Sequence, residues 1–501
     1  MDAALPPLIQ ALLQPHCYAH PVAQVELIQT HISWVLLAGY FAYKIKKPVR
    51  LPFLNFSTLA LRKTSCQEEL RLNRRFAPDL YLDVVAISGT PQEPRLDAES
   101  EPIDYAVRMR RFDEAGRLDR VCTRGDLRAE HLSDLADTLS AFHEHAAVTA
   151  PATRFGSPDA ILAAALENFD ELQQASTLPG AQQPLAALRA WTEAQHWLLA
   201  PLMEKRRAAG RVRECHGDLH LGNLVLIDSH VRLFDCIEFN EDLRWIDVVS
   251  DIAFAYVDLL AHRQGGLASW FVNEVFSRSG DYEAAALLRY YAVYRALVRA
   301  KVAWIRLRQN GGDAAEVAGY LALAGQLADP PAPRLVITHG LSGCGKTVAS
   351  TRMLQDDAQA GTLRLRSDVE RKRLFALAGD ARSGSPVGGG IYGADAQRQT
   401  YARLHDLAAL LLRAGWSVIV DATFLKRAER AAFAKLAQVS GASFSILAPA
   451  ATPAQLRERI LARNALGRDA SEATLQVLAQ QMQVVEPLTE DECLKGAALH
   501  F

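Results

Sequence analysis

Three polar side chains near the middle of the chain have the types and the spacing that phosphoryl transfer needs. His216, Asp218 and Asn223 follow the pattern H-x-D-x-x-x-x-N, in which the Asp takes the proton of an attacking hydroxyl and the Asn binds a metal. Two short apolar runs come next and predict a strand hairpin that ends at Asp235, a second carboxylate for the metal. We therefore expect Asp218 to be a catalytic base and Asn223 and Asp235 to be metal ligands. A polar turn between two strands is the alternative.

A second phosphate site follows a predicted strand at residues 334–338. The octapeptide GLSGCGKT, residues 340–347, matches G-x-x-x-x-G-K-[ST] between a strand and a helix. Glycines let backbone N–H groups curl around a phosphate at a helix N-terminus, the lysine reaches the β- and γ-phosphate oxygens, and the threonine binds Mg²⁺. Lys346 is also expected to be catalytic and Thr347 to be a metal ligand. The predicted phosphate-binding residues are Gly340, Ser342, Gly343, Cys344, Gly345, Lys346 and Thr347.

Two further carboxylates lie where predicted strands of the same region end. Asp368 follows the strand candidate 363–365, and Arg371 comes three residues later, which suits a carboxylate that takes a hydroxyl proton and a guanidinium that holds the acceptor. The apolar run 417–420 ends in Asp421, the position of a Walker B carboxylate near Mg²⁺. Alanine follows it, so the glutamate with which hydrolytic ATPases activate water is absent. We therefore expect Asp368 and Arg371 to be catalytic and Asp421 to bind the metal.

Basic residues on a helix predicted at 456–468 are placed to reach a transferring phosphate. Arg459, Arg463 and Arg468 lie on this helix and its exit. They form either a lid that closes on phosphate or a solvated basic face, and Arg463 is the candidate nucleotide contact. The glycine-rich stretch 383–390 is expected to be a mobile loop near the acceptor.

The first half of the chain must also supply a lysine and an acid that orient nucleotide phosphates. Two β-prone runs joined by a glycine turn predict a hairpin whose second strand ends in F-A-Y-K, with Lys44 as the phosphate lysine. Lys46 shares its strand face, because strand side chains alternate with a period of two. A helix predicted at 57–75 carries Glu68 and Glu69, one of which would pair with the lysine, and Glu69 is our candidate. The alternatives are an exposed edge-strand lysine and acids paired with surface arginines.

Further polar residues are expected to support the catalytic loop rather than to react. Asp247 and Asp251 are one helical turn apart and so share a face, where they brace the loop or line an acceptor pocket. His143 and His145, on a helix predicted at 127–147, are expected to be surface or hydrogen-bonded histidines.

The composition is that of a globular protein with no bias toward one kind of partner. Of 501 residues, 50% are hydrophobic and 22% are charged, and a net charge of −2 gives no general attraction to nucleic acid. The seven cysteines are scattered without a C-x-x-C pair, which argues against a disulfide framework or a zinc site. The N-terminus lacks a secretory pattern, and the longest uncharged apolar stretch, residues 32–43, is about half a membrane span. A cytoplasmic location is expected.

The motifs of the first half together resemble a known family. The stretches HGDLHLGN, LFDCIEFN and DVVSDIAF, preceded by THISWV and AYKIKKPV, resemble the aminoglycoside phosphotransferase and choline kinase-like family over roughly residues 20–325. The resemblance implies a two-lobed kinase-like fold with ATP and Mg²⁺ between the lobes and transfer to a small-molecule hydroxyl. No G-x-G-x-x-G loop is present, so the T-H-I-S stretch with Ser33 is expected to cover the phosphates. By matching motif, the resemblance implies that Asp218 is the base and that Asn223 and Asp235 are the metal ligands. It also implies that Lys44 is the phosphate lysine and that His216 organises the loop.

The second half resembles the small P-loop kinases. The phosphate loop, Asp368, Arg371, Asp421 and the arginine helix are similar to those of the subgroup that spans gluconate kinase, polynucleotide 5′-kinases and zeta-toxin-type sugar-nucleotide kinases. This resemblance implies that Asp368 is the general base. The whole chain looks like the predicted bifunctional proteins that join an aminoglycoside phosphotransferase-like domain to a P-loop ATP-binding domain.

The length exceeds one ordinary core, and a proline-rich break at 329–331 marks the expected domain boundary. We predict a first domain at 1–329, with an N-lobe at about 20–111 and a C-lobe at about 112–325, and a second domain at 334–501. The expected fold class is an α+β two-lobed protein-kinase-like domain followed by an α/β P-loop NTPase domain with a mainly parallel sheet.

The expected function is an ATP- and Mg²⁺-dependent phosphotransferase with two nucleotide sites. Its acceptors would be hydroxyl groups of small molecules of sugar, aminoglycoside or nucleoside type. In one alternative, one domain is a regulatory ATP-binding module. In another, the P-loop half is a nucleic-acid 5′-kinase, which the modest net charge and the lack of interleaved aromatic and basic residues disfavour. No membrane partner is expected, and the sequence leaves the acceptors and the oligomeric state open.

Overall fold

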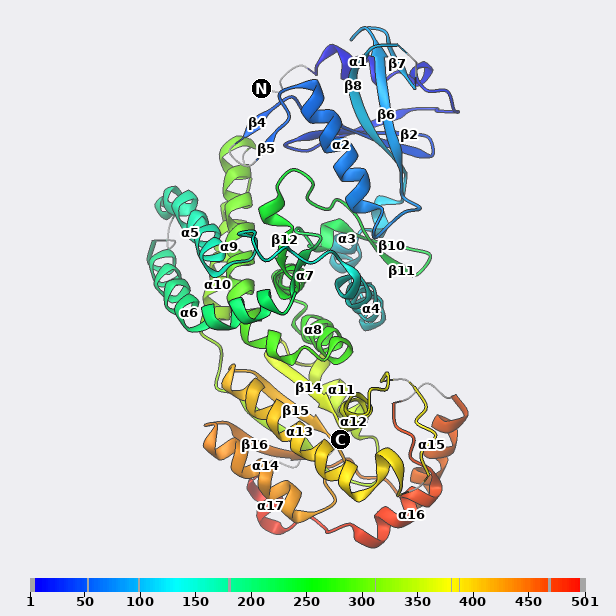
Figure 1. Ribbon diagram of the computed structural model, residues 1–501, viewed down its shortest axis with the longest axis vertical. Coiled ribbons are helices and arrows are strands. Elements are labelled where there is room, and N and C mark those ends of the chain that lie inside the picture. The colour runs from blue at the N-terminus through cyan, green and yellow to red at the C-terminus, as the bar shows by residue number, and fades with distance from the viewer. Residues whose placement is uncertain are drawn as a thin grey trace. The chain divides into compact units, whose positions relative to one another are not determined.

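The chain folds into two compact units in the computed structural model (Figure 1). The structure describes residues 5–51, 54–97, 100–178, 182–310, 312–379, 381–386, 388–466 and 470–495. The first unit draws on residues 1–127, 141–160 and 203–255, and the second on 128–140, 161–202 and 256–501. Because the units exchange segments along the chain, they do not test the boundary predicted at 329–334.

The first unit contains a six-stranded antiparallel sheet in the order β1-β2-β3-β8-β6-β7. Its strands are β1 Val25–Gln29, β2 Ser33–Ala38, β3 Phe41–Lys46, β6 Tyr81–Gly89, β7 Pro94–Leu96 and β8 Pro102–Arg110. The predicted hairpin is the β2–β3 pair, which turns at Gly39 with a φ of 56° that glycine adopts without strain. Helix α2, Leu59–Asn73, packs on β6 and β8 and is capped by Thr58, whose hydroxyl accepts the N–H of Leu61. The sheet and α2 carry the lysine and acid candidates.

Short strands and helices around the catalytic loop complete the first unit. β9 (Val212–Glu214) pairs with β12 (Trp245–Asp247), and β10 (Leu224–Ile227) pairs with β11 (His230–Leu233) as the predicted hairpin. Helix α7, Val248–Ala261, starts directly after β12. The other elements that lie wholly or partly in this unit are α1 Pro7–Leu12, β4 Arg50–Leu51, β5 Leu54–Asn55, α3 Leu118–Thr123, α4 Ala129–His145, α5 Pro158–Leu172 and α6 Gln182–Ala208.

The second unit is built on a four-stranded parallel sheet in the order β14-β15-β13-β16. Its strands are β13 Arg334–Thr338, β14 Thr362–Arg366, β15 Ser417–Asp421 and β16 Ser443–Leu447. Parallel strands that are covered on both faces are apolar almost throughout, and β13 and β15 are buried along nearly their whole length. With the antiparallel sheet of the first unit, this sheet confirms the predicted fold class. Most of α4, α5 and α6 also belongs to this unit. The α-helices that lie wholly within it are α8 Gly265–Ser279, α9 Ala285–Asn310, α10 Ala314–Ala328, α11 Lys346–Gln355, α12 Ser367–Leu374, α13 Ala394–Arg413, α14 Arg427–Val439, α15 Pro453–Leu466, α16 Leu475–Val484 and α17 Glu490–Lys495.

Helix α8 covers the edge of this sheet that β14 forms. The hydroxyl of Ser269 donates to the carbonyl of Thr362 at 2.9 Å, and the side-chain oxygen of Asn273 accepts the N–H of Arg364 at 2.7 Å. These bonds satisfy backbone groups that an edge strand would otherwise leave open. The start of α8 also lies close to the end of α11, because a Cβ on Gly266 would lie 1.6 Å from the carbonyl oxygen of Gln355.

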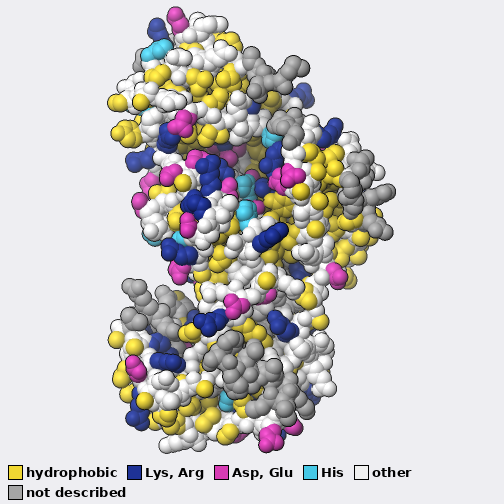
Figure 2. Space-filling model, turned by 180° about the vertical axis from the view of Figure 1, so that it is seen from behind, with side chains coloured by type: hydrophobic (Ala, Val, Ile, Leu, Met, Phe, Trp, Pro, Cys, Tyr) yellow, Lys and Arg dark blue, Asp and Glu magenta, His cyan; other side chains and the backbone are white. Residues whose placement is uncertain are grey.

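Within the described parts of the chain, no helix has the length and apolar character needed to cross a membrane. On the face shown in Figure 2, basic and acidic side chains are interspersed rather than gathered into one basic area. A broad surface for a phosphate backbone is therefore not visible on that face.

Candidate active sites

The first unit brings a lysine and two carboxylates together. The Lys44 ammonium on β3 lies 2.8 Å from Glu69 on α2 and also forms an ion pair with Asp235. Burial would lower the pKa of Lys44, but the carboxylates of Asp235 and Glu69 outweigh it and raise that pKa. Glu68, the other candidate acid, is only half-buried and pairs with Arg71 at 2.9 Å. The structure thus places Glu69 against the lysine.

Lys46 is buried beside the same acid. It forms ion pairs with Glu69 and with Glu238, and the hydroxyl of Ser65 donates to Glu238 at 3.2 Å. Both strand lysines therefore contact Glu69, while only Lys44 also contacts the metal-ligand candidate Asp235. Glu238 was not expected at this site, because sequence spacing alone does not show which acid after Asp235 points inward.

The catalytic loop holds its three polar residues in one network. The side-chain amide of Asn223 donates to the backbone carbonyl of Asp218 at 2.9 Å and to its carboxylate at 3.2 Å. His216 lies beneath the loop, where its Nε2 is 2.9 Å from the carbonyl of Phe234 and its Nδ1 accepts the N–H of Asp218. Burial lowers the pKa of His216, so the ring is neutral at neutral pH and donates from Nε2. The Asp218 carboxylate keeps 34% of its surface exposed and can be reached by an acceptor.

Asp235 has an unusual backbone conformation. Its φ is 63°, a conformation that is uncommon in residues other than glycine and that is concentrated at active sites. The hydroxyl of Tyr81 accepts its N–H at 3.0 Å. Burial would raise the pKa of Asp235, but the Lys44 ammonium outweighs this and lowers it, so the carboxylate is ionised and able to bind a cation.

Asp251 braces the catalytic loop. Its carboxylate accepts the N–H groups of His216 at 3.2 Å and Gly217 at 2.9 Å and contacts Nε2 of His143 at 3.2 Å. The expectation that Asp247 lies one turn away on the same helix is wrong, because Asp247 ends β12. Instead it caps α7 by accepting the N–H of Val249 at 3.0 Å and pairs with Arg206 at 2.8 Å.

Ser33 begins β2 opposite Lys46 in the strand pair. Its backbone N–H donates to the Thr30 hydroxyl at 2.9 Å, which shapes the T-H-I-S turn. Its own hydroxyl is fully buried and has no hydrogen-bond partner among the described residues. A contact between this hydroxyl and phosphate stays a prediction.

The phosphate loop of the second unit has the conformation that its glycines allow. Gly343 and Gly345 have φ values of 86° and 100°, and a Cβ on Gly343 would lie 2.8 Å from the carbonyl oxygen of Leu456. Helix α11 begins at Lys346, whose ammonium lies 2.9 Å from the carbonyls of Gly340 and Leu341. Cys344 is buried with its sulfur 3.8 Å from that ammonium.

The oxygen groups beside this loop suit a small divalent cation. Asp421 ends β15, and Thr347 lies in the first turn of α11; both line a cavity of about 850 Å³ together with Lys346. Carboxylate and hydroxyl oxygens are ligands that Mg²⁺ prefers, and loop N–H groups at a helix start suit phosphate. The residues present therefore fit a nucleotide phosphate with Mg²⁺.

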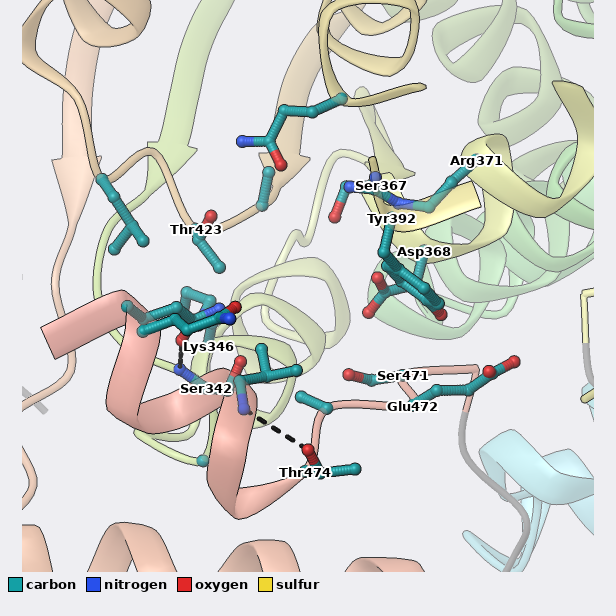
Figure 3. Close-up of a pocket in the computed structure, with 18 of the residues that line it drawn as sticks. Ser342, Lys346, Ser367, Asp368, Arg371, Tyr392, Thr423, Ser471, Glu472 and Thr474 are labelled. Atoms are coloured by element: carbon teal, nitrogen blue, oxygen red, sulfur yellow. Dashed lines mark hydrogen bonds between the residues drawn. The ribbon is translucent and has the colours of Figure 1, made fainter. Parts of the chain in front are cut away.

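The same cavity contains the acceptor candidates (Figure 3). Asp368 and Arg371 lie on α12, across the cavity from Lys346. The Arg371 guanidinium donates to the carbonyl of Ile391 at 3.2 Å and lies 5.2 Å from the ring centre of Tyr392. Tyr392 was not expected from the sequence, because a lone tyrosine in a glycine-rich stretch carries no motif. Part of the predicted loop 383–390 also lines the cavity, although Val387 lies outside the described residues.

Residues of helices α15 and α16 line this cavity next to the phosphate loop. Arg459 donates to the carbonyls of Gly343 and Cys344 at 3.4 Å each, and Arg463 donates to the carbonyl of Ala473 at 2.9 Å. Both arginines line the cavity, whereas Arg468 lies outside the described residues. Gln481 on α16 accepts the N–H of Ser342 at 2.8 Å, another contact that no sequence pattern indicated.

Comparison with known sequence families gives two matches. Residues 56–297 match the phosphotransferase enzyme family, and residues 335–488 match the AAA domain family. Uncharacterized proteins of Mycobacterium bovis and Mycobacterium tuberculosis are 29% identical to this chain over 467 residues, which is 92% of this chain and 92% of each relative.

Solved structures of kinases are among the similar folds. A choline/ethanolamine kinase family protein from Mesorhizobium loti is 14% identical, with a TM-score of 0.41, and the alignment covers 65% of this chain and 94% of that one. Amicoumacin kinase, solved with AMP-PNP, Ca²⁺ and Ami, is 14% identical with a TM-score of 0.41, covering 64% and 92%.

Proposed function

We propose that this chain, which joins a phosphotransferase enzyme domain to a P-loop domain, is an ATP- and Mg²⁺-dependent kinase with two nucleotide sites that phosphorylate hydroxyl groups of small molecules. One observation carries the proposal: each compact unit contains a lysine for phosphate, a candidate base and two oxygen ligands for a cation. ATP with Mg²⁺ would supply the phosphoryl group and spread its charge over the phosphate oxygens.

At the first site the protein contributes a base and a lysine held in place by ion pairs. Asp218 would take the proton of the acceptor hydroxyl, because its carboxylate is exposed and oriented by Asn223. Asn223 and Asp235 would hold the cation, and Lys44, fixed by Glu69, would hold phosphate. The rate gain would come mainly from positioning and charge stabilisation.

At the second site the phosphate loop and the acceptor groups face one cavity. Asp368 would take the acceptor proton while Arg371 holds the acceptor, and Thr347 and Asp421 would bind the cation. Arg463, which lines the same cavity, would contact the nucleotide.

The lining of this second cavity favours a small acceptor rich in hydroxyl groups. Besides its charged residues, among them Asp368, Arg371 and Glu472, the cavity is lined by uncharged hydrogen-bonding side chains and two tyrosine rings, which suit the polar edges and flat faces of a sugar-like molecule. These groups are Ser367, Ser385, Tyr392, Gln397, Tyr401 and Thr423.

The test is ATP-dependent phosphate transfer by the purified full chain across a panel of sugars, aminoglycosides, nucleosides and oligonucleotides. Asp218→Ala and Lys346→Ala are compared with wild type and with Lys435→Ala, which changes an exposed lysine on α14. We expect each of the first two substitutions to abolish transfer to a different acceptor, or to successive forms of one. If only Lys346→Ala matters, the first unit is a binding module. If oligonucleotides alone are phosphorylated, the second site is a nucleic-acid 5′-kinase.

A further inference from the structure

A buried arginine lies behind the phosphate loop. Arg364 is at the centre of β14 between Leu363 and Leu365, and only 3% of its surface is exposed. A long cationic side chain is rare at such a position, because burying a charge without a counter-charge is costly. Among the described residues no carboxylate lies within ion-pair distance of it. Its guanidinium lies 5.7 Å from the ring centre of Trp270, an aromatic face that favours a cation.

Among the described residues, the side-chain hydrogen bonds of Arg364 all go to helix α11, which carries the end of the phosphate loop. One guanidinium nitrogen, Nη1, lies 2.6 Å from the hydroxyl of Thr351, 3.2 Å from the hydroxyl of Ser350 and 3.4 Å from the carbonyl of Thr347. Burial lowers the pKa of Arg364 to about 10, so the side chain stays protonated at neutral pH. The hydrogen-bond acceptors of the cation are thus neutral oxygen atoms, while the carboxylates of Asp421 and Glu274 act on it only through space.

Ser350 connects Arg364 to the residues that would bind the divalent cation. Its oxygen accepts from Arg364, and its single proton can then be donated only to the Asp421 carboxylate at 3.2 Å or to the Thr347 carbonyl at 3.1 Å. Both of these acceptors belong to residues with which the second site would bind a divalent cation. Hydrogen bonds therefore connect Arg364 to Asp421 through Ser350 and, directly, to the backbone carbonyl of Thr347.

We propose that Arg364 is a positioning residue for the divalent-cation site of the phosphate loop, acting on Asp421 through Ser350 and on Thr347 through the first turn of α11. The charge of the guanidinium also adds to the positive potential at the start of α11, where phosphate would bind. This role rests on the proposed function, because it presumes that the second site binds a nucleotide with Mg²⁺.

The experiment measures binding of a fluorescent ATP analogue by the full chain as a function of Mg²⁺ concentration. An Asp235→Asn background removes the nucleotide site of the first unit. In that background Arg364→Met is expected to raise the half-saturating Mg²⁺ concentration by about 10- to 100-fold, the usual loss when a group that orients a metal ligand is removed. Arg364→Lys should recover part of this loss, because it restores the charge but lacks the planar guanidinium that lies over the ring of Trp270.

Two further variants separate positioning from a loss of folding. Ser350→Ala, which keeps the arginine, should shift the Mg²⁺ dependence in the same direction, and adding it to Arg364→Met should cause little further change, because both act in one chain of contacts. Arg352→Met is the control, since Arg352 lies exposed on the same helix.

An unchanged Mg²⁺ dependence in folded Arg364→Met overturns the role of Arg364. If Arg364→Met does not fold, an unchanged dependence in both Ser350→Ala and Arg364→Lys overturns it equally. A different result separates the two proposals: if the Asp235→Asn parent shows no binding that Lys346→Ala removes, the nucleotide site itself is wrong.

Discussion

The side-chain amide of Asn223 lies 3.2 Å from the carboxylate of Asp218, so the candidate base and a candidate metal ligand are held in one hydrogen-bonded loop. Since the NH₂ group of Asn223 is used for this contact, its carbonyl oxygen is the atom left for a cation. The same loop rests on Asp251, which fixes two of its backbone N–H groups.

Replacing Asp218 by Asn should remove the base and keep the shape of the loop. We expect the rate of transfer at the first site to fall by about 10²- to 10⁴-fold, the usual contribution of a positioned base. Nucleotide binding, measured by titration with a fluorescent analogue, should stay close to wild type. Asp228→Asn, in the exposed turn of the following hairpin, is the matched control and should leave the rate unchanged. An equal loss of binding and rate in Asp218→Asn would contradict the assignment.

The two strand lysines should differ in what their loss costs. Lys44→Met is expected to weaken nucleotide binding at the first site, because Lys44 alone contacts both Glu69 and Asp235. Lys46→Met should lower the free energy of unfolding by about 3–5 kcal/mol, because it leaves Glu238 buried and without its counter-charge. Urea unfolding and nucleotide titration of both variants separate these effects.

A second substitution checks the explanation for Lys46. Adding Glu238→Gln to Lys46→Met removes the unpaired charge and should restore a large part of the lost stability. A double variant no more stable than Lys46→Met alone would show that the ion pair is not the cause.

His216 should make the protein less stable at mildly acidic pH. Its pKa is lowered by burial in the folded state, whereas in the unfolded chain it lies near the usual value of about 6.5. Below that pH the unfolded state binds the proton more readily, so the free energy of unfolding falls as pH falls, until the folded pKa is passed. His216→Gln should flatten this slope in unfolding curves measured between about pH 5 and 7. A slope equal to that of wild type would contradict the role of the buried ring.

Two helical glycines should respond to alanine in opposite directions. Gly266→Ala would place a methyl group 1.6 Å from the carbonyl oxygen of Gln355 and should destabilise the protein by about 1–3 kcal/mol or more. Gly319→Ala, inside α10, meets no atom within 4 Å and should stabilise it by roughly 0.5–1 kcal/mol. Thermal unfolding of both variants is the measurement, and a shift of the same sign in both would show that the approach of α8 is not tight.

Local sequence patterns predicted much of this fold and part of its sites. The hairpin before Asp235, helix α2 and the strand before the phosphate loop were all visible, because apolar periodicity and glycine spacing are local properties. The choice between Glu68 and Glu69 was not, since it depends on how α2 rotates against β3. Glu238, Tyr392, Gln481 and Arg364 were also missed, because each becomes significant only through a partner far away in the sequence.

The covering of β14 by α8 has a practical consequence for truncation. A protein that began at residue 334 would keep the whole P-loop motif but would lose the side chains of Ser269 and Asn273 that occupy the outer edge of β14. It would also uncover Trp416, whose ring is buried and whose indole N–H donates to the carbonyl of Ala285. An open strand edge beside exposed aromatic surface promotes aggregation. Soluble expression of the second half should therefore require a start upstream of α8 rather than at the phosphate loop.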